Sequence, residues 1–184
     1  MASLSVIFWM YVILFAIIGG MRGWAKELLV TFSVILAITF KTLLESYVPF
    51  LRDLVAQSLT PDPPHNIVVA VFWMRVIILG LLVFFGYQTP NIPRFATKLT
   101  REKLQDIILG VFIGALNGYL IAGSIWFYMA DAGYPFSHIV APPTGDLAQI
   151  SETMLKYMPP RLLGVPGVYF AVVISFIFVI VVFV

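Results

Sequence analysis

IILGVFIGALNGYLIAGSIWFYM, the segment at residues 107–129, contains no charged side chain. A helix of this length rises about 35 Å, which exceeds the roughly 30 Å thickness of the hydrocarbon core of a bilayer. A helix on the surface of a soluble protein carries charged or polar residues along its outer face. This uninterrupted apolar segment therefore predicts a transmembrane helix.

Four further apolar segments of similar length accompany it. They cover residues 4–20, 28–43, 67–87 and 168–184. Over the whole chain 61% of the residues are hydrophobic, 11% are charged and the mean hydropathy is +1.00, whereas about a quarter of the residues of a soluble domain are charged. These values predict an all-α membrane protein, with one membrane domain over residues 1–184 built as a bundle of about five transmembrane helices.

Two segments outside the spans are amphipathic. Residues 44–59 and 146–158 carry apolar side chains at helical spacing, which is typical of helices that lie on a membrane surface. Pro49 indicates the start of the first helix, because proline is tolerated in the first turn. We favour the interpretation that both helices cap the bundle, over the alternative that they form a docking face for a partner protein.

Positive charge is concentrated in two loops, and this distribution predicts an orientation. Arg22 and Lys26 lie between the first two spans, and a larger basic group lies between the third and fourth spans. That group consists of Arg94, Lys98, Arg101 and Lys103. Because cytoplasmic loops carry an excess of Lys and Arg, we expect both loops in the cytoplasm, the N-terminus outside and the C-terminus inside.

Small residues recur four positions apart along the segment quoted first. They are Gly110, Gly114, Gly118 and Ala122. Such a pattern forms a smooth helical face that lets another helix approach closely within lipid. We favour packing within the chain, against a first span that contains Ala16, Gly20 and Gly23. The alternatives are self-association and docking to another membrane protein.

Two polar side chains fall inside the predicted spans, where they are costly and are functional candidates. Arg75 and Asn117 lie at similar depths when residues are counted from the opposite ends of their spans. One hypothesis is that the Arg75 guanidinium donates to the Asn117 side-chain oxygen or to nearby backbone carbonyls. The alternative is that Arg75 extends outward to Asp131 or to lipid headgroups.

The residues that usually carry catalysis are scarce. The chain contains no cysteine, and its two histidines, His65 and His138, lie in predicted outer loops without a carboxylate at metal-ligand spacing. No phosphate-binding loop or nucleophile motif is present. The sequence therefore predicts no catalytic residue, metal or cofactor, although a lipid or another hydrophobic ligand is compatible with it. The formal charge of +2 argues against a nucleic-acid partner.

Acidic residues are expected at the inner membrane boundary and not inside the spans. Glu27 and Asp106 lie near predicted helix N-termini, where the helix dipole favours negative charge. We expect them to form one cluster there with Arg22, Lys26 and Lys103. Without an acid inside the spans, a proton relay of the usual pump type has no evident carrier.

Three segments, GGMRGWAKE at residues 19–27, LQDIILG at residues 104–110 and GALNG at residues 114–118, resemble motifs of the colicin V production protein family of bacterial inner-membrane proteins. Residues 19–27, GGMRGWAKE, are similar to that family's Arg-Gly-aromatic-x-x-Glu turn and place Arg22, Gly23 and Glu27 in it. Residues 104–110, LQDIILG, resemble its Asp-Arg-x-x-Gly motif and place Asp106 at the start of the fourth span.

The third segment, residues 114–118 or GALNG, resembles the family's Gly-x-x-Arg-Gly continuation. The resemblance covers about residues 4–130 and implies a four-span core, to which this chain adds a C-terminal span. The sequence departs from the pattern at Ile107 and Asn117, where the family usually has arginine.

The resemblance implies a multi-pass protein of the bacterial plasma membrane that assists export or envelope physiology without catalysis. Expected partners are the lipid bilayer and other membrane proteins, or further copies of the chain. One alternative is an accessory structural subunit of a larger membrane complex, such as an energy-transducing complex. The other is a small transporter or channel, in which Arg75 and Asn117 would line the path.

Overall fold

The computed structural model describes residues 4–88 and 103–183, and within these ranges the chain folds entirely into helices and connecting loops, without a strand. The helices, in chain order, are α1 (Leu4–Arg22), α2 (Trp24–Tyr47), α3 (Pro49–Ser58), α4 (His65–Tyr87), α6 (Lys103–Asp131), α7 (Asp146–Leu155), α8 (Pro159–Leu162) and α9 (Gly167–Phe183). The predicted all-α membrane fold is confirmed.

Four of the described helices, α1, α2, α4 and α6, are long and apolar enough to cross a membrane. The predicted fifth span corresponds to α9, which is apolar throughout but has 17 residues. Its rise of about 26 Å falls slightly short of the hydrocarbon thickness of roughly 30 Å. Residue 184 of that predicted span lies outside the described residues.

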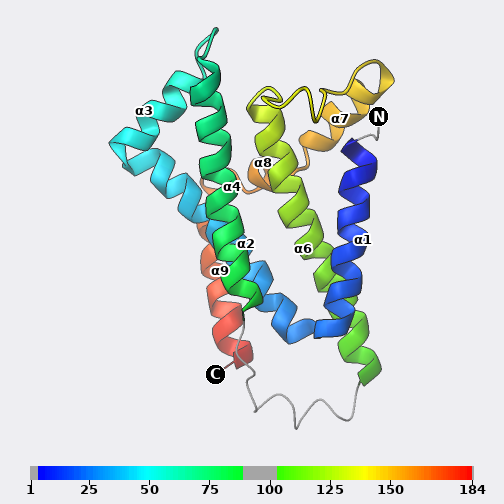
Figure 1. Cartoon of the computed structure of the whole chain (residues 1–184). Coiled ribbons are helices and arrows are strands. Elements are labelled where there is room, and N and C mark those ends of the chain that lie inside the picture. Colours follow the sequence, from blue (N-terminus) through cyan, green and yellow to red (C-terminus); the bar gives the residue numbers. More distant parts are fainter. Residues whose placement is uncertain (1–3, 89–102, 184) are drawn as a thin grey trace.

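Helix α6 lies at the centre of the bundle, with α1 along one side and α2 and α4 along the other (Figure 1). The core between α2, α4 and α6 is formed by apolar side chains at helical spacing. Its most buried members are Val30, Val34, Ile38, Phe72, Leu79, Leu120 and Tyr128. Helix α9 packs against α2, and the two ends of the chain lie at opposite ends of the bundle.

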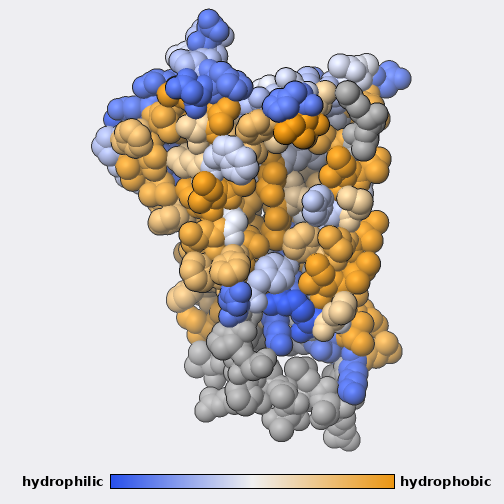
Figure 2. Space-filling model, viewed as in Figure 1, coloured by the Kyte–Doolittle hydropathy of each residue, from blue (hydrophilic) through white to orange (hydrophobic). Residues whose placement is uncertain are grey.

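The surface has the polarity of a protein that crosses a bilayer. Figure 2 shows hydrophilic residues at the end that carries α3 and α7, hydrophobic residues over the middle, and a second hydrophilic region near the other end. Large apolar side chains are exposed on the spans themselves, for example Trp9 of α1, Ile77 of α4 and Phe112 of α6. In water such a surface would aggregate, so lipid is its natural solvent.

The two amphipathic segments form helices, with different bounds from those expected. Leu44 and Tyr47 belong to the last turns of α2, and a separate helix begins at Pro49. Proline lacks the backbone N–H that would continue α2 and constrains the preceding residue to an extended conformation, which Val48 adopts. The second segment ends as a helix at Leu155, three residues earlier than expected.

Only some of the basic residues on which the predicted orientation rests belong to the described residues. Arg22, at the end of α1, and Lys26, near the start of α2, lie beside the turn between those helices, and Lys103 begins α6. The other basic residues of the second loop, Arg94, Lys98 and Arg101, lie outside the described residues.

Candidate functional site

A tight corner between α1 and α2 positions the first group of polar side chains. Gly23 makes the corner with φ 87°, a left-handed conformation that favours glycine. The Asp106 carboxylate, from the first turn of α6, accepts a hydrogen bond from the Trp24 backbone N–H at 3.2 Å. A Cβ at Gly23 would lie 2.9 Å from an Asp106 oxygen. The corner therefore packs closely against Asp106 of α6 at Gly23 and is also hydrogen-bonded to that carboxylate through the Trp24 N–H.

Glu27, one turn into α2, is fully buried with 0% exposure. One of its carboxylate oxygens accepts from Arg22 Nη1 at 2.6 Å, and the other accepts from Asn117 Nδ2 at 2.8 Å. The Asn117 amide also donates to the Glu27 backbone carbonyl at 2.9 Å. Both oxygens of this buried carboxylate are thus paired, as a buried charge requires.

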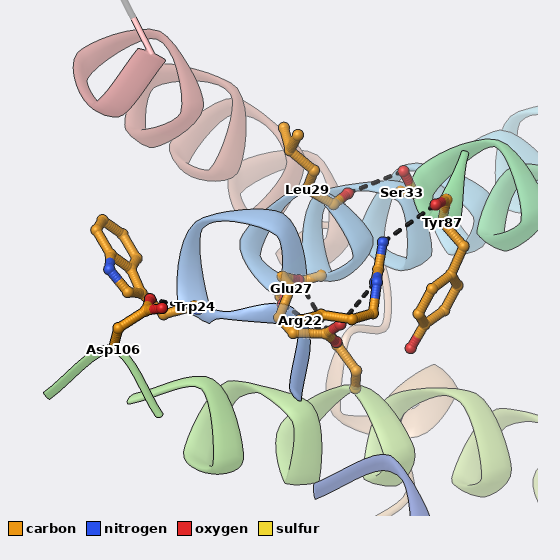
Figure 3. A network of polar contacts seen from close by, with 9 residues as sticks. Arg22, Trp24, Glu27, Leu29, Ser33, Tyr87 and Asp106 are labelled. Atoms are coloured by element: carbon orange, nitrogen blue, oxygen red, sulfur yellow. Dashed lines mark hydrogen bonds and ion pairs between the residues drawn. The ribbon is translucent and has the colours of Figure 1, made fainter. Parts of the chain in front are cut away.

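The same contacts extend to α4. Arg22 donates from Nη2 to the Tyr87 carbonyl at 3.1 Å, and its guanidinium stacks on the Tyr87 ring at 4.3 Å (Figure 3). Thr31 completes the arrangement by donating to Asn117 Oδ1 at 2.7 Å. We call Arg22, Glu27, Thr31, Tyr87 and Asn117 the corner cluster, because they join α1, α2, α4 and α6 beside the corner.

A second cluster lies nearer the opposite end of the bundle. Arg75 of α4, which is 7% exposed, donates to Glu45 at 2.7 Å and to Asp131 at 2.5 Å. Lys41 forms an ion pair with the other Glu45 oxygen at 3.1 Å, and its ammonium and the Arg75 guanidinium both lie 5.7 Å from the Tyr128 ring centroid. These charges, the Arg75 cluster, join α2, α4 and α6.

The predicted pairing of Arg75 with Asn117 is wrong. The two residues belong to different clusters, and Asp131, the alternative partner, is the one that Arg75 contacts. The depth estimate assumed that α4 and α6 end at the same level. Instead α6 extends beyond the end of α4 (Figure 1). Asn117 contacts Glu27, whose partner Arg22 donates to the Tyr87 carbonyl, so Asn117 lies near the end of α4 and not beside Arg75.

The expected single charge cluster at the inner boundary is also wrong. Glu27 is buried among the helices with Arg22, whereas Asp106 caps the corner separately, and Lys26 and Lys103 are exposed. Glu27 lies in the first turn of α2, and the surrounding helices bury its side chain completely.

The small residues of α6 face α1 in the structure. A Cβ added to Gly110 would collide with the Gly19 carbonyl, and one added to Gly114 would lie 2.8 Å from Gly19 Cα. At Gly118 an added Cβ would lie 2.9 Å from Val12 Cα. The part of this face formed by Gly110, Gly114 and Gly118 is therefore occupied by α1 and is not open to a second chain. Of the three expected partners Ala16, Gly20 and Gly23, Gly20 lies in this contact, with its Cα 3.4 Å from a Cβ added at Gly110, and the other close neighbours are Gly19, Phe15 and Val12.

Sequence reasoning missed two other close approaches between helices. At Gly86 an added Cβ would lie 2.6 Å from Ser33 Oγ, so this glycine lets the last turn of α4 reach α2. At Gly123 it would lie 2.9 Å from Met158 Sδ, beside α8. Each is an isolated glycine, and only the partner helix reveals its role.

The chemistry available at the two clusters is pairing of charges. Among the described residues no group of three or more His, Cys, Asp or Glu side chains is arranged to hold a metal ion. The carboxylates of Glu27 and Glu45 are engaged by cations or amides of neighbouring helices. Breaking a buried ion pair by removing one partner is strongly destabilising, so these contacts fix the relative positions of the helices.

The fold and the two clusters define a class, a multi-pass helical membrane protein whose spans are joined by buried ion pairs. The chain belongs to the colicin V production protein family, whose sequence model matches residues 4–140. The matched region contains both clusters and ends before α7. No curated protein and no solved structure matches the chain.

Proposed function

We propose that this protein assists export or envelope maintenance in the bacterial plasma membrane, without catalysis, and that the corner cluster is its functional centre. The observation that carries the proposal is the position of this cluster. Arg22 and Glu27, which belong to the turn that resembles the family's motif, converge with Asn117 from three helices around one fully buried carboxylate.

The non-enzymatic part of the proposal is supported by how the polar groups are used. A catalytic acid, base or nucleophile needs access to a substrate, whereas Glu27 is sealed from the surface and has both oxygens paired. The orientation that we propose, with the N-terminus outside and the C-terminus inside, rests on the basic residues near the corner.

An accessory subunit of a larger membrane complex is the second candidate. It is favoured by α9, which lies beyond the family-matched region and leaves large apolar side chains uncovered. Phe170 is 66% exposed and Val181 74%. Transport has less support, because Arg75 and Asn117, which would line one path, lie in separate clusters.

The test is complementation of a gene deletion in the bacterium that encodes the protein. We expect the deletion to reduce the amount of exported protein or to sensitise cells to detergents. Wild type and Glu152→Gln should restore both, whereas Glu27→Gln at equal membrane levels should not. Glu152 is the matched control because it is exposed on α7.

A deletion without an export or envelope defect would contradict the proposal. If the tagged protein then co-purifies in native mass spectrometry with a defined set of other membrane proteins, the accessory-subunit candidate replaces it.

A further inference from the structure

Between α7 and α9 the chain crosses the bundle as a short segment that we call the strap, residues 156–166. Figure 1 shows it passing from α7 by way of α8, beside α6, to the start of α9. Met158 and Pro159 are buried at the point where the strap meets Gly123 of α6. A Cβ added at Gly123 would lie 2.9 Å from an atom of each. The strap is therefore packed tightly against α6.

The strap lies near one edge of the hydrocarbon core. Helix α6 has 29 residues and rises about 43 Å, close to the 40–45 Å of a bilayer with its headgroups. Gly123 is about 12 Å from the end of α6 at Asp131, whereas the headgroups occupy only about 5 to 7 Å on each side. Helix α9 starts directly after the strap, and its rise of about 26 Å nearly fills a core of roughly 30 Å. The strap is therefore just below the headgroups.

The exposed side chains of the strap have the composition of a membrane interface. Tyr157, Leu162 and Val165 are 64%, 57% and 62% exposed. Lys156 and Arg161 are exposed between them in the sequence. Aromatic and apolar side chains beside lysine and arginine are typical of segments that lie where hydrocarbon meets the headgroups. The composition of the strap therefore agrees with its depth.

The two cations of the strap form no ion pair within the described part of the chain. Glu152 is one turn before Lys156 and does not pair with it, and no carboxylate contacts Arg161. The buried cations Lys41 and Arg75, in contrast, are both paired with carboxylates. Unpaired charge in the hydrocarbon core is costly, so long basic side chains extend to the headgroups. The lipid must therefore supply the anion.

We infer that the strap binds the headgroup of an anionic phospholipid, whose phosphate contacts Arg161 and is attracted by Lys156. A guanidinium matches the oxygens of a phosphate with two parallel N–H donors. Two unpaired cations favour a lipid with a net negative charge over a zwitterionic lipid, because they repel the ammonium group of phosphatidylethanolamine. Leu162 and Val165 contact the acyl chains of the same lipid. This site is independent of the proposed function.

The inference is tested by native mass spectrometry of protein released from nanodiscs with equal amounts of phosphatidylglycerol and phosphatidylethanolamine. Wild type should retain phosphatidylglycerol in preference. Arg161→Gln should lower the retained ratio of the two lipids about 5-fold, the effect of one cation near an anionic surface, and adding Lys156→Gln should lower it further. Arg52→Gln, the control, removes an exposed arginine of α3 that pairs with Asp53, and should keep the ratio. No preference in wild type, a preference that survives both substitutions, or an equal loss in Arg52→Gln would overturn the inference.

The depth of the strap is tested in the same nanodiscs with an impermeant maleimide. Leu162→Cys is at an exposed position of the protein, but lipid should cover the thiol, which should react only after detergent is added. Thr144→Cys, at an exposed position before α7, should react at once. Equal labelling of the two thiols in nanodiscs would place the strap in water and would also overturn the inference.

Discussion

Glu27 shows how a single side chain can join a membrane bundle. Its carboxylate pairs with Arg22 from α1 and Asn117 from α6, and through Arg22 it is connected to the Tyr87 carbonyl of α4. Asn117 stands where the resemblance of the sequence to the family's motif led us to expect arginine. Here the amide donates to the carboxylate, and Arg22 supplies the positive charge.

Replacing Glu27 by alanine should therefore destabilise the protein strongly. The variant leaves Arg22 and the Asn117 amide without their shared acceptor inside the bundle. We expect a loss of about 3 to 5 kcal/mol in the free energy of unfolding, the range for breaking a buried ion pair. The measurement is unfolding by SDS in mixed micelles.

Glu152→Ala serves as the control, since Glu152 is exposed on α7, and should change the same free energy by less than about 0.5 kcal/mol. Equal stabilities for the two variants would show that the corner cluster does not hold the helices together.

The importance of these residues was only partly visible in the sequence. The motif at residues 19–27 singles out Arg22 and Glu27, and the cost of polar groups in lipid singles out Asn117 and Arg75. Which of them pair depends on how far α6 extends past α4. That offset depends on tertiary packing, such as the close approach of Gly86 to Ser33 of α2, and helix lengths alone do not reveal it.

At the scale of the helices, the contact of α1 with α6 depends on glycine. Gly19, Gly110 and Gly114 bring the two backbones together, because an added Cβ at any of them would collide with the opposite backbone. Within lipid, such close packing replaces the hydrophobic effect as the force between helices.

Gly114→Ala should weaken this contact, and Gly80→Ala should not, since nothing lies within 4 Å of a Cβ added at Gly80. We expect Gly114→Ala to cost about 1 to 3 kcal/mol, the usual range for overpacking, without a change in oligomeric state. Unfolding in mixed micelles and native mass spectrometry provide the two readouts. A variant of normal stability whose oligomeric state changes would support self-association instead.

Hydropathy was sufficient to predict the long helices, because α1, α2, α4 and α6 each contain the apolar segment expected. The residues at which these helices end were harder to predict from the sequence. Helix α2 continues to Tyr47 and so includes the charged residue Glu45. Glu45 forms ion pairs with Arg75 and Lys41, so its negative charge is not left unpaired in lipid. Only the partners on α4 and on the preceding turn explain why the helix continues.

At the scale of the molecule, the two clusters correspond to the two sides of the membrane. Glu27 and Glu45 lie about 27 Å apart along α2, close to the thickness of a hydrocarbon core. The spans between them are covered by apolar side chains that face lipid (Figure 2). The α1–α2 corner should therefore lie on one side of the membrane, and α3 and α7 on the other.

This two-sided arrangement is tested most directly by the accessibility of single cysteines, because the chain contains no cysteine of its own. Lys26→Cys and Gln88→Cys place a thiol at exposed positions near the corner, and Asp62→Cys and Thr144→Cys place one at exposed positions near the other end. Each variant is treated with an impermeant maleimide in intact spheroplasts and again after permeabilisation.

We predict that Asp62→Cys and Thr144→Cys are labelled in intact spheroplasts, and that Lys26→Cys and Gln88→Cys are labelled only after permeabilisation. The reverse pattern would preserve the bundle and overturn the proposed orientation. Labelling of Lys26→Cys and Asp62→Cys from the same side would contradict the membrane-spanning bundle itself.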